Sequence, residues 1–439
     1  MAPVPAVIEA TRHLAHRAVR PETPARLRLW AAVVIATAVA LLAATSLLMA
    51  RVQAEVRTIG DVAAPQAATA ADLYFALSDM DAQVARLVLV GDADALAGTQ
   101  IDALGTYRER SRQVDADLQA SLTTATGAAD RATVLALLDD LAVYRERVWQ
   151  TLSTPSDTHG YYTQATNILH QELLPSAQRL RDASQNQLNR AYAAKSTTEG
   201  FGVALTLGLG AALVLLLLIL QVWLARRFRR VLNPALLAAT LITVALVVPA
   251  AVLFSVQQRW LGDARDHSLT PFLALSQARA ISYDAAADTS RYLISERLAY
   301  YRQDFTHKSN CLVSGGSCGP GGETVAGGLA AVSGSPQVLE RWQAYQRDHE
   351  RIAGLADAGN GAAAIDALTG IGRGDAAFDF SYYDAAVDQI ATTRKAAFDA
   401  ALHDTETLLT GWAVIPLVAM GVVILLVPLG VRRRFAEYR

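Results

Sequence analysis

Four long apolar runs, without a single Asp, Glu, Lys or Arg, dominate the hydrophobic pattern of the chain. Each run has roughly 20 residues, which is the length that a helix needs to cross a hydrocarbon core about 30 Å thick. We therefore predict four membrane-spanning helices. The predicted spans are residues 29–50, 201–223, 235–256 and 412–431.

The segment after the first predicted span has the periodicity of a helix in a bundle. Apolar residues recur alternately every four and three residues, so one face of this helix is expected to pack in a core. Gly91 and the polar residues after it end this pattern. Two further helices are expected over 99–122 and 130–152, and a fourth runs from about residue 161 into the second span. The apolar stripe is Leu73, Leu77, Met80, Val84 and Leu87.

The second half of the chain repeats the order of the first: span, long polar segment, span, basic segment. Pro65 and Pro271 precede similar helices, and Tyr161-Tyr162 and Tyr382-Tyr383 each open a last helix. The common order of these weak matches predicts an internal duplication. The predicted fold class is an all-α membrane protein with four transmembrane helices and two extracytoplasmic four-helix-bundle domains.

Clusters of arginines stand beside the spans in three short segments. Short Lys- and Arg-rich segments stay in the cytoplasm, so both termini are predicted to be cytoplasmic in a multi-pass protein of the cell membrane. The length of the first apolar run favours an uncleaved anchor over a signal peptide. The cytoplasmic parts are a tail over 1–28, a basic loop over 224–234 and a tail over 432–439; the outside parts are bundle 1, residues 51–200, and bundle 2, residues 257–411.

The chain has two cysteines, Cys311 and Cys318, and both fall in the second outside segment. A disulfide can form and persist there. Metal-binding thiolates are the alternative, but no His or other Cys stands at ligand spacing. A disulfide is the prediction, within a glycine-rich loop that replaces much of the second helix of bundle 2.

Composition excludes several classes of function. The formal net charge is -2, which leaves no electrostatic footprint for nucleic acid. The sequence contains no P-loop, no His-Glu-x-x-His and no Gly-x-Ser-x-Gly, so we predict no enzymatic activity, no cofactor and no metal. The acidic pair Asp79 and Asp81 and the scattered histidines are expected on a solvated helix surface.

The predicted ends of the bundles carry the candidate partner-binding residues, because binding tends to use loops on a rigid scaffold. Packing at a helix start is the alternative role for the tyrosines. The cytoplasmic segments are too short for an output domain, so arginines beside the second and fourth spans are candidates for coupling to another protein; topology and lipid contact are the alternative. The partner candidates are Asp92, Asp94, Asp157, His159, Tyr161, Tyr162, Tyr382, Tyr383 and the Cys311–Cys318 loop, and the coupling candidates are Arg226, Arg227, Arg229, Arg230, Arg432, Arg433 and Arg434.

This layout resembles the sensor half of bacterial chemoreceptors, present twice. As a whole it is similar to the actinobacterial GlnX-type family of four-span membrane proteins, with two external helical domains and little cytoplasmic chain. The resemblance implies an extracytoplasmic solute-binding lipoprotein of the glutamine-binding type on one side and a cytoplasmic serine/threonine protein kinase on the other. It implies no catalytic residues.

The sequence therefore predicts a non-enzymatic transmembrane relay for an amino-acid signal, embedded in the lipid bilayer. A direct small-molecule sensor is the first alternative, with its ligand between helices or at the interface of a homodimer. An envelope scaffold or an accessory subunit of a transporter is the second alternative.

Overall fold

The computed structural model describes residues 23–125, 127–228, 233–319, 323–410, 412 and 414–435. Within these residues the regular secondary structure is helical, apart from one pair of two-residue strands. The elements of the first half follow the sequence prediction to within a few residues. They are α2 (Thr23–Arg57), the π-helical turn η1 (Thr58–Ala63), α3 (Ala64–Val90), η2 (Asp94–Leu96), α4 (Ala97–Thr124), α5 (Ala128–Ser153), η3 (Pro155–Asp157), α6 (Thr158–Ile168), the π-helical turn η4 (Leu169–Leu173) and α7 (Leu174–Phe228).

The second half begins and ends like the first but differs between its long helices. A short helix and a small antiparallel hairpin follow α9, as the glycine-rich sequence suggests. The elements are α8 (Pro234–Ala264), the π-helical turn η5 (Arg265–Leu269), α9 (Thr270–Ile294), α10 (Ala299–Ser314), β1 (Gly316–Ser317), β2 (Thr324–Val325), α11 (Gly328–Ser333), α12 (Pro336–Asp357), α13 (Gly361–Thr369), α14 (Ala376–Thr410) and α15 (Ile415–Phe435).

Three long helical stretches are apolar enough to cross a membrane. They are Arg28–Val90, Thr158–Arg226 and Pro234–Ile294, and they contain the first three predicted spans. The fourth predicted span coincides with a shorter apolar helix, Ile415–Gly430. The structure thus supports a membrane-spanning protein, and the fourth crossing stays a prediction.

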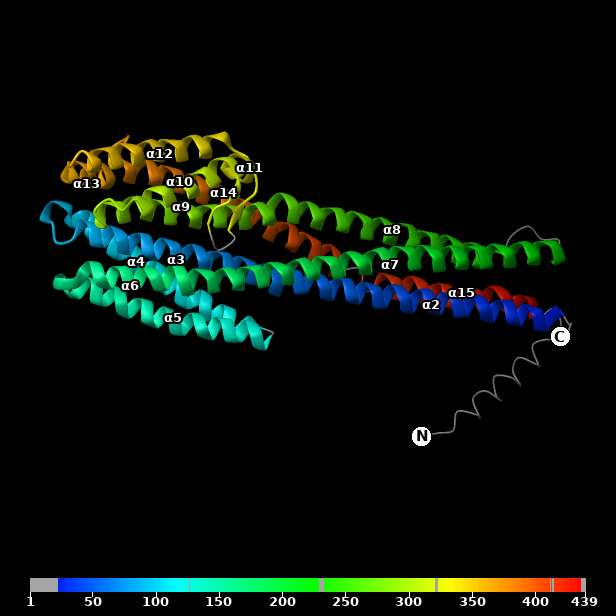
Figure 1. Cartoon of the computed structure of the whole chain (residues 1–439). Coiled ribbons are helices and arrows are strands. Elements are labelled where there is room, and N and C mark those ends of the chain that lie inside the picture. The colour runs from blue at the N-terminus through cyan, green and yellow to red at the C-terminus, as the bar shows by residue number, and fades with distance from the viewer. Residues whose placement is uncertain are drawn as a thin grey trace. The chain divides into compact units, whose positions relative to one another are not determined.

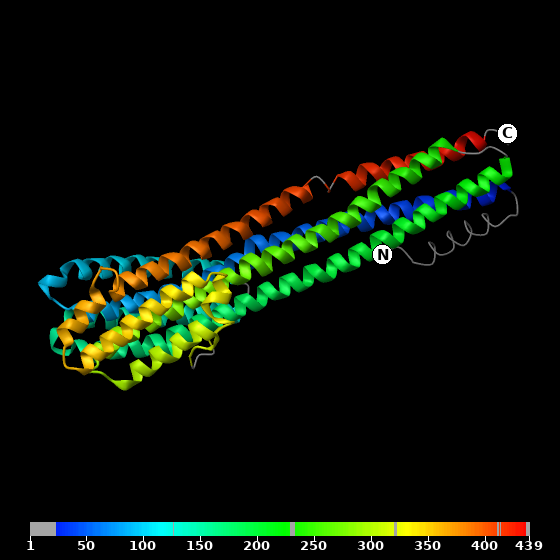
Figure 2. The same ribbon diagram turned by 90° about the horizontal axis from the view of Figure 1, so that it is seen from above.

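The described residues form two compact units, each drawn from both halves of the chain. The described residues of unit 1 lie within Met1–Arg57, Tyr192–Gly262 and Ala401–Arg439, and those of unit 2 lie within Thr58–Ala191 and Asp263–Ala400. In unit 1 the apolar helices α2, α7, α8 and α15 run side by side (Figures 1 and 2). Their shared cluster includes Leu41 of α2, Leu217 of α7, Leu246 of α8 and Val423 of α15.

Close packing in unit 1 depends on a small residue. A Cβ atom built at Gly210 of α7 would lie 2.6 Å from Cγ2 of Val247 on α8. Such a contact is too short, so glycine permits the two helices to approach this closely.

Each π-helical turn stands directly before a helix that has proline at its second position. Proline lacks an N–H group and clashes with the carbonyl four residues earlier, and a π turn accommodates that clash within a continuing helix. Pro65 follows η1, Pro175 follows η4 and Pro271 follows η5. The carbonyl of His267, four residues before Pro271, accepts a hydrogen bond from Arg394 of α14 at 2.6 Å.

Unit 2 differs from the two separate bundle domains that the sequence predicts. Helices of both halves share one core, and α3 packs against α4 and α5 on one side and against α9 on the other. Leu77 of α3 and Tyr283 of α9 belong to the same buried cluster, and Phe75 lies edge-to-face with Tyr283 at 5.3 Å between ring centroids. A helix with apolar and small residues all round must be buried on every side, which explains why the halves associate through α3.

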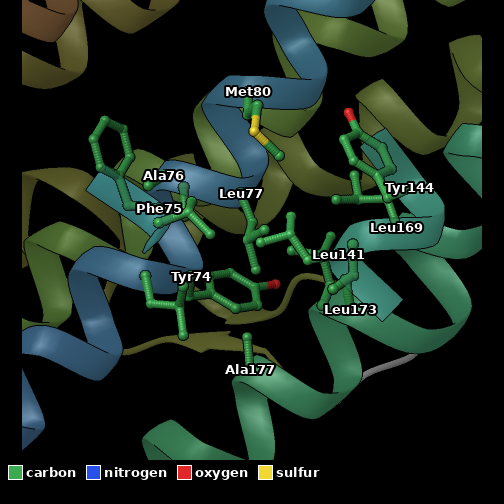
Figure 3. Packing of buried hydrophobic residues seen from close by; sticks show 14 of the residues in the cluster. Tyr74, Phe75, Ala76, Leu77, Met80, Leu141, Tyr144, Leu169, Leu173 and Ala177 are labelled. Carbon is green, nitrogen blue, oxygen red and sulfur yellow. The ribbon is translucent and has the colours of Figure 1, made fainter. Parts of the chain in front are cut away.

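Figure 3 shows the first-half part of this core. Leu77 and Met80 of α3 point toward Leu141 of α5 and toward Leu169 and Leu173 of the π turn η4. The turn is therefore fixed on its apolar side by the core, and its other residues are free to face elsewhere.

Candidate functional site

A cavity of about 500 Å³, lined by many charged and polar side chains, lies inside unit 2, between elements of the two halves. Two of its lining residues, Asn167 and Gln171, are exposed, so the cavity is open to solvent. The first half contributes α3, α6, η4 and the start of α7, and the second half contributes α9, α10 and the hairpin region. The lining includes Tyr74, Thr166, Asn167, His170, Gln171, Asp284, Asp288, Arg291, Tyr300, Tyr301, Asp304, Lys308, Cys318, Gly319 and Glu323.

Arg291 of α9 forms the inner wall and is 1% exposed. Its Nη1 donates hydrogen bonds to Asp288 at 2.6 Å and to Asp284 at 3.0 Å, and its Nη2 donates to Asp81 of α3. The guanidinium geometry suits several carboxylates at once, and it joins the two halves through charge. Tyr144 of α5 donates a further hydrogen bond to Asp81 at 3.2 Å.

Lys308 of α10 forms a second centre of charge beside the first. Its ammonium lies 2.6 Å from Asp284, 2.7 Å from Asp288 and 2.7 Å from Asp304. The Lys308 side chain is buried, so these three carboxylates compensate its desolvation. Both cations of the cavity wall therefore pair with carboxylates of the protein, while Nε of Arg291 has no partner among the described residues.

The pKa values of the two central aspartates, Asp284 and Asp288, are shifted in opposite directions. Both residues lie outside the apolar runs. Burial raises the pKa of Asp288 to about 7, against the pull of Lys308 and Arg291. Burial would also raise the pKa of Asp284, but Lys308, His170 and Arg291 outweigh it and lower the pKa of that carboxyl. Burial lowers the pKa of His170, so its imidazole is neutral at neutral pH, with Nε2 3.5 Å from Asp284.

The opposite wall of the cavity comes from the disulfide-closed hairpin. Cys311 and Cys318 form a disulfide with 5.1 Å between their Cα atoms, which confirms the predicted bond. The bond ties the hairpin to α10. The Tyr74 hydroxyl of α3 donates a hydrogen bond to Glu323 Oε1 at 3.1 Å, which connects the hairpin region to the first half.

Three buried polar atoms of the lining have no hydrogen-bond partner within the described residues. They are Glu323 Oε2, Arg291 Nε and the hydroxyl oxygen of Thr166, whose residue is 6% exposed. Thr163, the previous threonine on α6, differs from Thr166, because its hydroxyl donates a hydrogen bond to the backbone carbonyl of His159 at 2.8 Å. Buried polar groups are almost always paired, so unpaired atoms facing a cavity indicate room for a ligand or water.

Four of the predicted partner-binding residues lie at the surface. Asp92 and Asp94 are exposed in the segment after α3, and Asp157 and His159 are exposed at the start of α6. None of them lines the cavity. They stay candidates for contact with another protein.

The tyrosines divide into two pairs of different burial. Tyr161 is half-buried and Tyr382 is 52% exposed, with the guanidinium of Arg341 3.6 Å from its ring centroid. Tyr162 and Tyr383 are 4% and 0% exposed. These two side chains are core residues and offer no surface to a partner, because the second tyrosine of each pair faces the inside of its helix packing.

The Cys311–Cys318 loop lies beside Tyr74, in the first half of α3, rather than near the residues that follow Val90. Its predicted place among the distal loops is therefore wrong: α10 folds back along α9 and returns the loop to the middle of unit 2. Among the coupling candidates, Arg226 and Arg227 lie in α7, Arg432, Arg433 and Arg434 lie in α15, and Arg229 and Arg230 fall outside the described residues.

Sequence reasoning missed the buried charge. Asp79 and Asp81 were expected in solvent, yet both are 0% exposed, and Asp79 pairs with Arg110 of α4 at 2.6 Å. Their position around Met80, inside an apolar stripe, is the signal that was present in the sequence. The arginines that compensate them are distant along the chain, so the local sequence pattern does not predict these ion pairs. His349 was also expected at the surface but is 3% exposed and stacks on Phe305 at 3.5 Å between ring centroids.

Comparison with known proteins gives one family match. Residues 55–193 match the model of an actinobacterial sensor domain. The match covers η1, α3 to α6, η4 and the start of α7, and thus the first-half wall of the cavity. No curated protein and no solved structure matches the chain. The match supports a sensor role in an actinobacterium, and the apolar helices are consistent with a sensor in a membrane.

The cavity of unit 2 is lined by residues inside and outside the matched sensor domain. In the part of the chain that the structure describes, no group of three or more His, Cys, Asp or Glu side chains is arranged to hold a metal ion. Paired charges, tyrosines and unpaired acceptors around an open volume are suited to holding a small polar molecule.

Proposed function

We propose that this chain is a membrane-spanning, non-enzymatic sensor that binds a small molecule directly in the cavity of unit 2. The observation that supports it best is that cavity, of about 500 Å³, within the size range of ligand pockets. It lies against the matched sensor domain and is walled by residues of both halves.

The π turn η4 offers a route for the signal. His170 and Gln171 of this turn line the cavity, and Leu174 opens α7, which is one helix as far as Phe228. A ligand that contacts η4 would favour one packing of this turn over another. Shifts of about 1–2 Å between packed helices are the usual scale of such transitions, and a stiff helix passes them along its axis.

The test uses the full chain in nanodiscs and the exposed cavity residue Asn167. Asn167→Trp fills the opening without removing a hydrogen bond among those found for the described residues. Gln164→Trp is the matched control, because Gln164 is exposed on the same helix and does not line the cavity. Thermal unfolding and hydrogen exchange are measured with glutamine, glutamate, aspartate and spermidine.

We expect at least one of these probes to raise the unfolding temperature and to protect residues 166–175 in the wild type and in Gln164→Trp. The same probe should have no effect on Asn167→Trp. A complete lack of response to all probes, or an equal response in Asn167→Trp, would contradict direct sensing in this cavity.

A second candidate is a relay that receives an amino-acid signal from a solute-binding lipoprotein and passes it to a cytoplasmic serine/threonine protein kinase. Its support is the exposure of large apolar side chains near the acidic candidates: Ile101 is 72% and Trp149 69% exposed. Exposed aromatic and aliphatic residues of this size are typical of protein contacts.

The relay is tested by crosslinking from a photoreactive residue at Trp149 in a native envelope, with and without glutamine, glutamate and aspartate. A crosslinked solute-binding protein would support it. Recovery of none under any condition would count against the relay and leave direct sensing as the sole proposal.

A further inference from the structure

We propose that the ligand of the cavity is an organic cation, a small amine with one or more ammonium groups. This inference rests on the proposed function, because it names the chemistry of the same site. An anionic amino acid is the ligand that it excludes.

Both cations of the cavity wall already pair with carboxylates of the protein, although Nε of Arg291 has no partner among the described residues. Arg291 uses Nη1 and Nη2 on Asp81, Asp284 and Asp288, and Lys308 is surrounded by three aspartates. A ligand carboxylate would have to displace one of these buried partners and leave an aspartate uncompensated. That exchange is unfavourable because an unpaired charge in a protein interior is costly.

Carboxylates are in excess around the same volume. Four acidic side chains line the cavity against two cations; Asp288, with a pKa of about 7, is partly protonated at neutral pH, but the other three still outnumber the cations, and His170 is neutral. Asp81 adds a further carboxylate directly behind Arg291. The site therefore attracts positive charge. The lining carboxylates are Asp284, Asp288, Asp304 and Glu323.

Unpaired acceptor atoms show where an ammonium group would bind. Glu323 Oε2 is buried without a partner among the described residues, although its other oxygen accepts the Tyr74 hydroxyl. Thr166, 6% exposed, presents a second unpaired oxygen from α6. An ammonium has three donors and no acceptor, so it can pair with either atom, whereas a carboxylate could pair only with the hydroxyl.

Aromatic side chains and the volume complete the match. Tyr300 and Tyr301 line the cavity, with 5.4 Å between their ring centroids, and tyrosine faces attract organic cations. The volume of about 500 Å³ is larger than a bare ion needs. An organic amine uses the carboxylates, the tyrosines and the volume together.

The experiment measures binding to the full chain in nanodiscs of zwitterionic phosphatidylcholine, by calorimetry. The probes are spermidine, putrescine, glutamine, glutamate and Ca²⁺. Glu323→Gln keeps the shape of the side chain and removes its charge. Glu340→Gln is the matched control, because Glu340 is exposed on α12 and does not line the cavity. Asp304→Asn is a second cavity variant, and the unfolding temperature of each variant reports whether it folds.

We expect spermidine or putrescine to bind, with an affinity that falls as salt is added. Glu323→Gln should weaken binding by about tenfold or more, since it loses a charge-assisted hydrogen bond, and Glu340→Gln should not. Asp304→Asn should weaken it in the same direction, which keeps the test valid if Glu323→Gln fails to fold.

Binding of glutamate alone, abolished by Asn167→Trp, would overturn the cation inference and leave direct sensing intact. Stoichiometric Ca²⁺ binding that depends on Glu323 would also overturn it, in favour of a metal. If no probe binds to the wild-type protein, both proposals are overturned.

Discussion

At the scale of single residues, the protein buries charge in the contact between its two halves. Arg291, 1% exposed, contacts carboxylates of α3 and α9, and Asp79 and Asp81 on α3 are 0% exposed. Burying such groups adds little net stability, because desolvation opposes the attraction. It does make the pairing specific, since a shifted register would leave several charges unpaired.

Replacing Arg291 with methionine tests this balance. We expect Arg291→Met to lower the free energy of unfolding by ~3–5 kcal/mol, because Asp81 and Asp288 lose their buried partner. The measurement is urea unfolding in detergent, followed by tryptophan fluorescence. Arg302→Met is the control: Arg302 is 49% exposed in its pair with Asp357, and its loss should cost about 1 kcal/mol or less. Equal effects of the two variants would contradict the prediction.

Asp117 on α4 provides a test of pH dependence. Burial and the nearby Asp72 raise its pKa to about 7, although Lys395 opposes them. A raised carboxyl pKa means that the folded state holds the proton more tightly, so stability falls as the pH rises from about 4 to 7. Asp117→Asn, which stays neutral, should therefore raise the unfolding temperature at pH 8 and leave it unchanged at pH 4.

The control for this variant is Asp115→Asn on the same helix. Asp115 lies 2.9 Å from Arg145, so losing its charge should leave the unfolding temperature at pH 8 unchanged or lower. A gain in stability from Asp117→Asn that is the same at both pH values would show that its carboxylate is not the cause.

At the scale of elements, the three π turns are the points where the long helices change register. Each one precedes a proline, and η4 also faces the cavity. π turns within α-helices are frequent at functional sites. The place of η4 at the start of α7 makes it the element most directly exposed to a ligand.

Pro175→Ala removes the cause of the η4 turn. The new N–H group at residue 175 can donate a hydrogen bond within the helix, so we expect slower hydrogen exchange at residues 171–175. Pro336→Ala is the control, because Pro336 opens α12, where an N–H group has no helical partner. If exchange at 171–175 is the same in both variants, proline does not shape the turn.

At the scale of the whole molecule, neither half of the chain forms unit 2 alone. The buried cluster around Leu77 and Met80 of α3 includes Tyr283 and Ile294 of α9. The cavity likewise needs walls from both halves. The proposed binding of a ligand in this cavity therefore requires both halves of the chain.

A chain cut between Phe228 and Asn233 tests this dependence. We expect the two fragments, co-expressed with a tag on the first, to copurify, because α3 and α9 bury apolar surface against each other. Either fragment expressed alone should aggregate or unfold at lower temperature. Fragments that are each monodisperse and do not copurify would contradict a shared core.

The sequence determined the local features of the protein. The apolar runs, the helix boundaries, the stop at Gly91 and the disulfide follow from residue patterns a few positions long, and the structure agrees with them. The family match over residues 55–193 adds a sensor role to this picture. Local patterns suffice here because helix length, helix ends and a seven-residue loop depend on neighbours in the chain.

Only the tertiary structure decided which surfaces meet. No residue pattern indicates that Arg291 compensates Asp81, 210 residues away, or that Glu323 accepts a hydrogen bond from Tyr74, 249 residues away. Periodicity assigns one buried face to a helix such as α3, but it does not reveal a second face buried by a distant helix. The cavity exists only because the halves pair through α3 and α9, and that pairing is a contact between residues remote in sequence.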